Sequence, residues 1–127
     1  MREILFRAKN RSGSWSYGDL HLHCNHPHLH ALGNGARSTY IDTSTVGQFT
    51  GTFDKKGERI FEGDFLQIED EKNVKVTTLV CWDETRCGFI AKPLKKQNFN
   101  CFILGLWHRN NSEIIGNRWD NNPESVQ

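Results

Sequence analysis

The chain has 127 residues, the usual size of a single globular domain, and its 16 basic and 15 acidic residues give a net charge of +1. This balance excludes the strong basic surplus that marks an obvious nucleic-acid-binding protein. No stretch approaches the roughly 20 apolar residues of a membrane span, and residues 1–7 lack the apolar run of a signal peptide. We therefore expect a cytoplasmic protein with no membrane partner.

Alternating apolar and polar residues predict an amino-terminal hairpin with one apolar face. Its strands cover residues 4–8 and 15–24, joined by a turn at residues 10–14. The first strand also carries basic residues, which indicate either a sheet edge protected by charge or a patch for phosphates: Arg2, Arg7, Lys9 and Arg11. Residues 25–37, with Pro27 and two glycines, predict a loop.

The rest of the chain alternates short strand patterns with turn residues. Strands are expected at residues 38–41, 46–51, 59–61, 65–69, 74–82, 89–91 and 114–119, and residues 42–45 favour a turn or a single helical turn. The glycines expected at chain reversals are Gly47, Gly51, Gly57 and Gly63. For residues 93–107 the sequence does not distinguish a strand from a helix. The pattern predicts a mostly β barrel or sandwich with at most one or two short helices.

Three stretches of this sequence resemble the YopX family of phage and prophage proteins. They are MREILFRAK with WSYGDL near the amino terminus, IDTSTVGQFTG continuing through DKKG to IFEGD, and EIIGN with NPE near the end. The resemblance implies one domain with an SH3-like barrel core over residues 41–119, an amino-terminal β extension over residues 1–40 and a polar tail over residues 120–127. It implies no reaction, because the family has none assigned. Residues 21–37 correspond to a stretch that varies in the family, and residues 99–108 fit its pattern poorly.

Most of the central motif is expected to be scaffold, because glycine and apolar patterning alone explain it. Packing does not require four of its polar members, and these, with one tryptophan, are the candidate binding residues: Gln48, Thr50, Glu62, Asp64 and Trp82. A second group of aromatic residues either fills the core or forms a platform for bases or a peptide: Trp82, Phe89, Trp107 and Trp119.

Five histidines and one cysteine lie between residues 21 and 30, the densest run of metal-ligating residue types in the chain. On a strand, His21 and His23 share one face and Cys24 takes the other, whereas a structural zinc site needs four converging ligands. A polar, solvent-facing hairpin edge explains the same alternation. We expect no metal or cofactor, with Zn²⁺ or Ni²⁺ binding by His21, His23 and His26 as the alternative. A pH response of exposed imidazoles is a third interpretation.

No known catalytic motif is present. The carboxylates of Asp83-Glu84 and of residues 69–71 diverge as sequence neighbours, and Cys87 with His108 lacks an orienting third group. We therefore expect no enzyme. The expected function is a non-catalytic protein-interaction or assembly module that binds a protein partner or its own copies. The alternative is a nucleic-acid-binding accessory protein of a mobile element.

Overall fold

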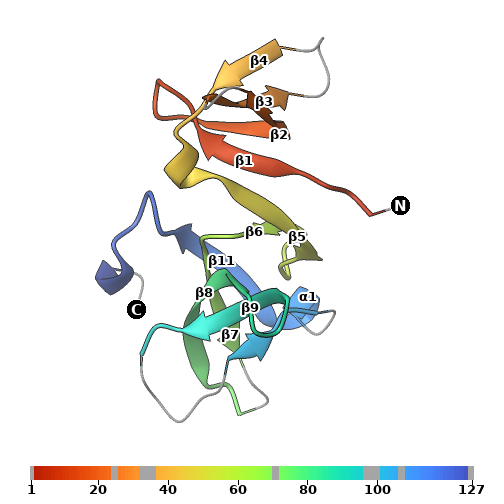
Figure 1. The fold of residues 1–127 in the computed structure, drawn as a ribbon. Helices are drawn as coiled ribbons and strands as arrows, with labels where there is room; N and C mark the ends of the chain where they lie inside the picture. The colour runs from red at the N-terminus through yellow and green to blue at the C-terminus, as the bar shows by residue number, and fades with distance from the viewer. Residues whose placement is uncertain are drawn as a thin grey trace. The chain divides into compact units, whose positions relative to one another are not determined.

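The computed structural model describes residues 2–23, 26–31, 37–69, 72–95, 101–105 and 108–125. The chain divides into two compact units, unit 1 (Met1–Phe49) and unit 2 (Thr50–Gln127), shown in Figure 1. The division falls inside strand β5 (Gly47–Phe53), whereas the family resemblance placed the start of the core at residue 41.

Antiparallel strands make up almost all of the regular structure in the described ranges. Besides β5 they are β1 (Phe6–Lys9), β2 (Trp15–His23), β3 (His26–Ala31), β4 (Arg37–Tyr40), β6 (Arg59–Phe61), β7 (Asp64–Glu69), β8 (Lys75–Asp83), β9 (Gly88–Pro93), β10 (Phe102–Ile103) and β11 (Ser112–Asn117). Helical turns in these ranges are η1 (Thr43–Thr45), α1 (His108–Asn111) and η2 (Pro123–Ser125). The predicted mostly β class is confirmed. No helix among the described residues is long and apolar enough to span a membrane.

In unit 1 the strands follow the order β4-β3-β2-β1-β5. The predicted hairpin of β1 and β2 is confirmed, with Arg7 opposite Tyr17 and Lys9 opposite Trp15. The interpretation of the first strand as a sheet edge is wrong, because β1 also pairs with β5, where Phe6 lies opposite Gln48. This neighbour comes from a distant part of the sequence, so local alternation gave no sign of it.

The loop predicted for residues 25–37 is wrong over residues 26–31, which form β3 between β2 and β4. Pro27 lies within this strand, opposite Leu22, although proline is uncommon inside sheets because it has no backbone N–H to donate. Since β2 and β3 have a neighbour on each side, the histidine segment is not the hairpin edge that the alternation favoured. Residues 24, 25 and 32–36 lie outside the described ranges.

The two faces of the unit 1 sheet differ in exposure. Ala8 and Gly18 are buried and Leu20 is half-buried on one face, while the other presents exposed residues at alternate positions: Tyr17, His21, Ser38 and Tyr40. Residues directly opposite in antiparallel strands share a face, as do residues two apart on one strand. We refer to the exposed side as the outer face of unit 1.

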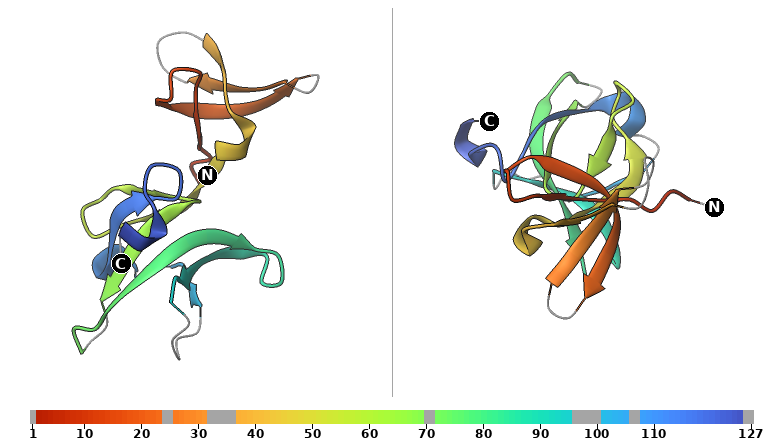
Figure 2. Two further views of the ribbon diagram at one scale, coloured as in Figure 1. Left: turned by 90° about the vertical axis from the view of Figure 1, so that its left-hand side faces the viewer. Right: turned by 90° about the horizontal axis from the view of Figure 1, so that it is seen from above.

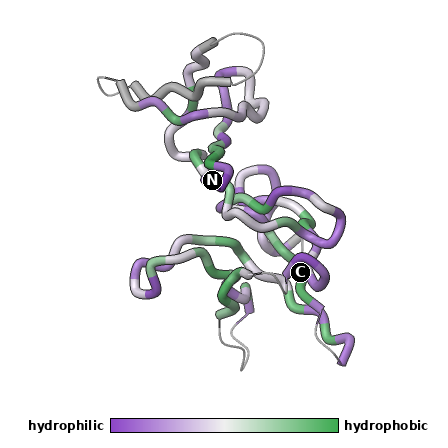
Figure 3. The backbone as a smooth tube through the Cα atoms, turned by 90° about the vertical axis from the view of Figure 1, so that its right-hand side faces the viewer, coloured by the Kyte–Doolittle hydropathy of each residue, from purple (hydrophilic) through white to green (hydrophobic). Residues whose placement is uncertain are grey.

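In unit 2 a five-stranded sheet has the order β10-β9-β8-β7-β11, and β8 and β9 form a long, curved hairpin (Figure 2). Its core brings residues of β6 to β9 together with partly buried side chains of later segments: Ile60, Leu66, Ile68, Val80 and Ala91, with Phe102, Leu104 and Ile114. Figure 3 shows hydrophobic residues along these strands and hydrophilic ones at the turns. The pairings described in unit 2 do not close a barrel.

Within the apolar segment of residues 99–107, the described residues 101–105 contain the two-residue strand β10, and the helix α1 begins at His108. On the other side β9 runs as far as Pro93. Residues 96–100 and 106–107, over which strand and helix were left open, lie outside the described ranges.

Tight turns of unit 2 depend on glycine where the sequence predicted it, at Gly57 and Gly63, whose φ angles are 81° and 88°. At Gly63 a Cβ would lie 2.1 Å from Cζ3 of Trp119, so the indole packs directly on the backbone. The same backbone donates to the Val80 carbonyl at 2.8 Å and accepts from Arg118 at 2.9 Å. Gly47 and Gly51 lie instead within β5, so the predicted chain reversals there are wrong, although Gly51 has the expected positive φ, 91°.

Candidate binding surface

Two of the predicted binding residues hold the backbone of unit 2. Asp64 is only 1% exposed, and its Oδ2 accepts the Phe61 N–H at 2.8 Å across the β6–β7 turn. Thr50 donates its Oγ1 hydroxyl to the Ile60 carbonyl at 2.8 Å, which links β5 to β6. These polar side chains satisfy backbone groups that folding would otherwise bury without a partner.

The other three predicted residues occupy different positions. Gln48 is half-buried in unit 1, on the face opposite to that of Arg7, and Glu62 is half-buried in unit 2. Trp82, near the end of β8, is 48% exposed and lies edge-on to Phe89, with ring centroids 5.1 Å apart. A buried Asp64 and an exposed Trp82 do not form one surface.

Of the four aromatic residues predicted to form a platform, the described residues bring only two into contact. Trp82 and Phe89 contact each other across β8 and β9. Trp119 packs on Gly63 and serves the β6–β7 turn, and Trp107 lies outside the described residues. The pair offers a small exposed aromatic patch at one end of the β8–β9 hairpin.

Groups considered for catalysis occupy structural positions. His108 is buried at the start of α1, where its Nδ1 accepts the Gly105 N–H at 3.1 Å. Burial lowers the pKa of His108. Cys87 is exposed in the β8–β9 turn, and its Sγ donates to the Glu84 carbonyl at 3.4 Å. Each group is thus bonded to its own turn.

The carboxylate of Asp83 is also a turn group. It accepts the Thr85 N–H at 2.9 Å and pairs with Arg86, and this side-chain hydrogen bond is the main reason that the pKa of Asp83 is lowered. Of the other acidic run, Asp70 and Glu71 lie outside the described residues.

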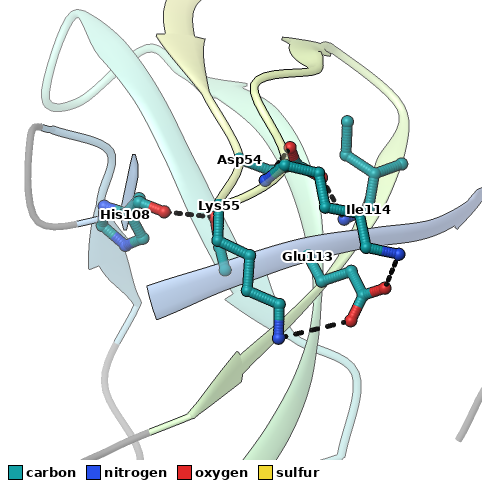
Figure 4. A network of polar contacts seen from close by, with 7 residues as sticks. Asp54, Lys55, His108, Glu113 and Ile114 are labelled. Carbon is teal, nitrogen blue, oxygen red and sulfur yellow. Dashed lines mark hydrogen bonds and ion pairs between the residues drawn. The ribbon is translucent and has the colours of Figure 1, made fainter. Parts of the chain in front are cut away.

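A polar network anchors the β5–β6 turn to β11 (Figure 4). The buried Asp54 accepts the backbone N–H groups of Lys56 and Glu58 through Oδ1, both at 2.9 Å, and that of Ile114 through Oδ2 at 3.1 Å. Glu113 pairs with the Lys56 ammonium at 2.6 Å. The sequence identified Asp54 only as a turn former, because its bond to Ile114 spans 60 positions.

A polar hollow of about 210 Å³ lies beside this network in unit 2. Its lining consists of amides, one lysine and one glutamate: Lys55, Gln67, Glu69, Asn73, Asn110 and Asn111. Lys55 also pairs with Glu113 at 3.5 Å. This lining offers hydrogen bonds from its amides and one charge of each sign, from Lys55 and Glu69.

The outer face of unit 1 gathers basic and aromatic side chains. We call the following set the basic–aromatic face: Arg7, Lys9, Arg11, Trp15, Tyr17 and Tyr40. The Arg7 guanidinium carbon lies 4.5 Å from the centroid of the Trp15 ring, and Nζ of Lys9 lies 4.6 Å from it. The Arg11 guanidinium lies 5.1 Å from the ring of Tyr40. Contacts of this kind are attractive because the cation meets the negative face of the ring.

Strand register creates this arrangement. Arg7 and Lys9 are two apart on β1 and face Tyr17 and Trp15 on β2, so all four share the outer face. Arg7 is only 6% exposed, whereas the Tyr17 and Tyr40 side chains are 45% and 49% exposed. The sequence identified the cations but not their aromatic partners. The predicted hairpin turn at residues 10–14, combined with the alternation of faces along each strand, would have placed these aromatic residues on the same face as the cations.

Together these features define a small all-β protein of two compact units, with turn-anchoring polar networks and one basic and aromatic sheet face. A family model described as YopX protein matches residues 6–126, so this chain belongs to the YopX family. The resemblance seen in the three sequence stretches is thereby confirmed. No curated protein matches the chain.

Proposed function

We propose that this protein is a non-catalytic, cytosolic binding module of a phage or integrated element, and that its ligand is single-stranded nucleic acid. The single observation that carries the proposal is the basic–aromatic face of unit 1. Its geometry favours the nucleic-acid alternative over the protein partner that the sequence placed first. The groups considered for catalysis support the non-catalytic part, because their described hydrogen bonds stabilise turns.

The chemistry of this face suits unpaired nucleotides. Single-stranded nucleic acids bind sheet surfaces by stacking bases on aromatic rings while arginine and lysine contact the phosphates. Tyr17 and Tyr40 are exposed, Arg11 lies over the ring of Tyr40, and Lys9 lies over the ring of Trp15 on the same face. A duplex hides the faces of its bases, so we expect it to bind this surface more weakly.

The distribution of charge between the two units also favours an anionic ligand for unit 1. Unit 1 contains five basic residues (Arg2, Arg7, Lys9, Arg11 and Arg37) and three acidic ones (Glu3, Asp19 and Asp42), a formal charge of +2. Unit 2 contains eleven basic and twelve acidic residues, a formal charge of −1. The nearly neutral composition of the whole chain therefore conceals a positive unit 1.

Fluorescence anisotropy with labelled single-stranded DNA, single-stranded RNA and duplex at low salt tests the proposal. The variant Lys9→Gln/Arg11→Gln removes two charges from the face, and Lys75→Gln/Lys92→Gln removes two from exposed positions of unit 2. We expect the first pair to weaken single-strand binding by about tenfold or more and the second to leave it nearly unchanged. Absence of binding at low salt, or equal losses in both variants, would refute the proposal.

Exposed apolar residues of unit 2 favour a protein partner as a second candidate. Ile103 is 70% exposed on β10, an outer strand of its sheet, and Trp82 and Phe89 form the aromatic patch described above. Outer strands and exposed apolar residues are common sites of association. Light scattering and a pull-down from host extract test this candidate, and a strict monomer that retains no partner would count against it. The SH3-like barrel that the family implies for residues 41–119 stays a prediction.

A further inference from the structure

The polar hollow of about 210 Å³ in unit 2 lies beside the end of strand β7. Gln67 and Glu69 are two apart on this strand, so their side chains lie on the same face of the sheet. On that face Gln67 lies opposite Glu113 of β11, the residue that pairs with Lys55 (Figure 4). Turn and helix segments complete the described lining: Lys55, Asn73, Asn110 and Asn111. Strand β7, the turns before β6 and β8, and the helix α1 thus meet at one place.

Most of the lining side chains are not used by the fold. Gln67 and Glu69 are half-buried, and no hydrogen bond or ion pair joins their side chains to another described residue. The same holds for the exposed side chains of Asn73 and Asn110. They differ in this from Asp54, whose carboxylate accepts backbone N–H groups. Polar groups on a partly buried wall need hydrogen-bond partners, and a ligand can supply them.

The hollow carries one charge of each sign. Lys55 provides the positive charge, and it shares Glu113 with Lys56, whose contact is the shorter, at 2.6 Å against 3.5 Å. Because Glu113 is already paired with Lys56, the Lys55 ammonium, on a side chain that is 46% exposed, can bind a second carboxylate. Glu69 provides the negative charge and can accept hydrogen bonds from an ammonium group.

We infer that this hollow binds a small zwitterion, namely a free polar α-amino acid, for which L-glutamine is the probe. The carboxylate of the ligand pairs with Lys55, its ammonium group pairs with Glu69, and its side-chain amide bonds to the asparagine and glutamine amides of the lining. The volume of about 210 Å³ lies below the roughly 300–1,000 Å³ of sites for drug-sized molecules, so it suits a ligand of the size of one amino acid.

Other classes of ligand suit the hollow less well. A phosphate group would meet the carboxylate of Glu69, and a metal ion would meet the ammonium group of Lys55. Among the described residues no three His, Cys, Asp or Glu side chains come together to hold a metal. The described lining also contains no aromatic ring on which a base could stack. The inference is independent of nucleic-acid binding, because the hollow belongs to unit 2 and the basic–aromatic face to unit 1.

The test titrates the full, isotope-labelled chain with L-glutamine and follows the amide signals by NMR. We expect saturable shifts of the side-chain amide signals of the lining, with a dissociation constant of about 1 mM: Gln67, Asn73, Asn110 and Asn111. N-acetyl-L-glutamine lacks the ammonium charge and L-glutaminamide lacks the carboxylate, so each should bind about fivefold more weakly, or weaker still.

Lys55→Gln and Glu69→Gln each remove one of the two charges and should weaken L-glutamine binding by about fivefold or more. Lys92→Gln and Glu84→Gln are the matched controls, because they remove one charge from exposed positions of unit 2 outside the described lining, and they should change the affinity by less than about twofold. The backbone amide signals show whether each variant is folded. The comparison of the ligand analogues uses the unsubstituted chain and decides the matter without any variant.

Three results would overturn the inference. One is the absence of shifts of the lining amides at about 20 mM L-glutamine, well above the expected dissociation constant. Another is equal binding of L-glutamine and its two analogues, because the charges would then have no part in recognition. The third is a loss of affinity in the control variants as large as in Lys55→Gln and Glu69→Gln.

Discussion

Gly63→Ala is expected to destabilise unit 2 through two separable effects. A non-glycine residue at φ 88° costs about 1 kcal/mol or more in backbone strain. The added Cβ would also lie 2.1 and 2.3 Å from the Cζ3 and Cη2 atoms of Trp119, and overpacking of this kind costs about 1–3 kcal/mol. We therefore expect a loss of about 3 kcal/mol in the free energy of unfolding, measured by urea denaturation with far-UV circular dichroism.

Gly57→Ala is the matched control, because φ at Gly57 is 81° but a Cβ added there would meet no atom within 4 Å beyond its chain neighbours. It should cost only the backbone strain, about 1 kcal/mol. In a Trp119→Ala background the clash is absent, so Gly63→Ala should also fall to about 1 kcal/mol. If Gly63→Ala costs no more than Gly57→Ala, or the same with and without Trp119, the close packing of the indole on this turn is refuted.

Three further predictions concern polar groups of unit 2. Asp54→Ala removes the acceptor of three backbone N–H groups, including that of Ile114, so the free energy of unfolding should fall by about 3 kcal/mol or more, whereas Lys56→Ala at an exposed ion pair should change it far less. Asp64→Asn should lower the melting temperature without changing nucleic-acid affinity, and an affinity loss in the folded variant would contradict its scaffold role. Because the pKa of His108 is lower in the folded state than in the unfolded one, stability should be full above pH 6.5 and decrease toward pH 5, by at most about 1.4 kcal/mol per pH unit. His108→Gln should flatten the pH dependence in this window, and an unchanged slope would exclude His108 as its source.

Local signals in the sequence predicted much of the strand and turn pattern. The turn at residues 54–57 and the reversal at Gly63 follow from aspartate and glycine preferences, and the helical turn η1 forms where Asp42 accepts the Ser44 N–H at 3.0 Å. These features depend on residues within a few positions of one another.

Features that depend on distant partners were not predictable in this way. The first strand was interpreted as an edge because its second neighbour, β5, follows only after β2, β3 and β4. Pro27 suggested a loop, although the pairing of β3 with both β2 and β4 keeps it in a strand. For the candidate surface, composition identified Arg7 and Lys9, but only the register with β2 showed that Trp15 and Tyr17 lie on the same face.

The salt dependence of single-strand binding tests the central claim most directly. The two cations of the basic–aromatic face that are not buried, Lys9 and Arg11, contribute about 0.7 each to the slope of log affinity against log salt for single strands. The account predicts a slope of about −1.4 for the unsubstituted protein, or roughly a sevenfold loss between 50 and 200 mM salt, and a slope close to zero for Lys9→Gln/Arg11→Gln. A slope near zero for the unsubstituted protein, or one that this variant leaves unchanged, would contradict the claim that this face of unit 1 binds nucleic acid.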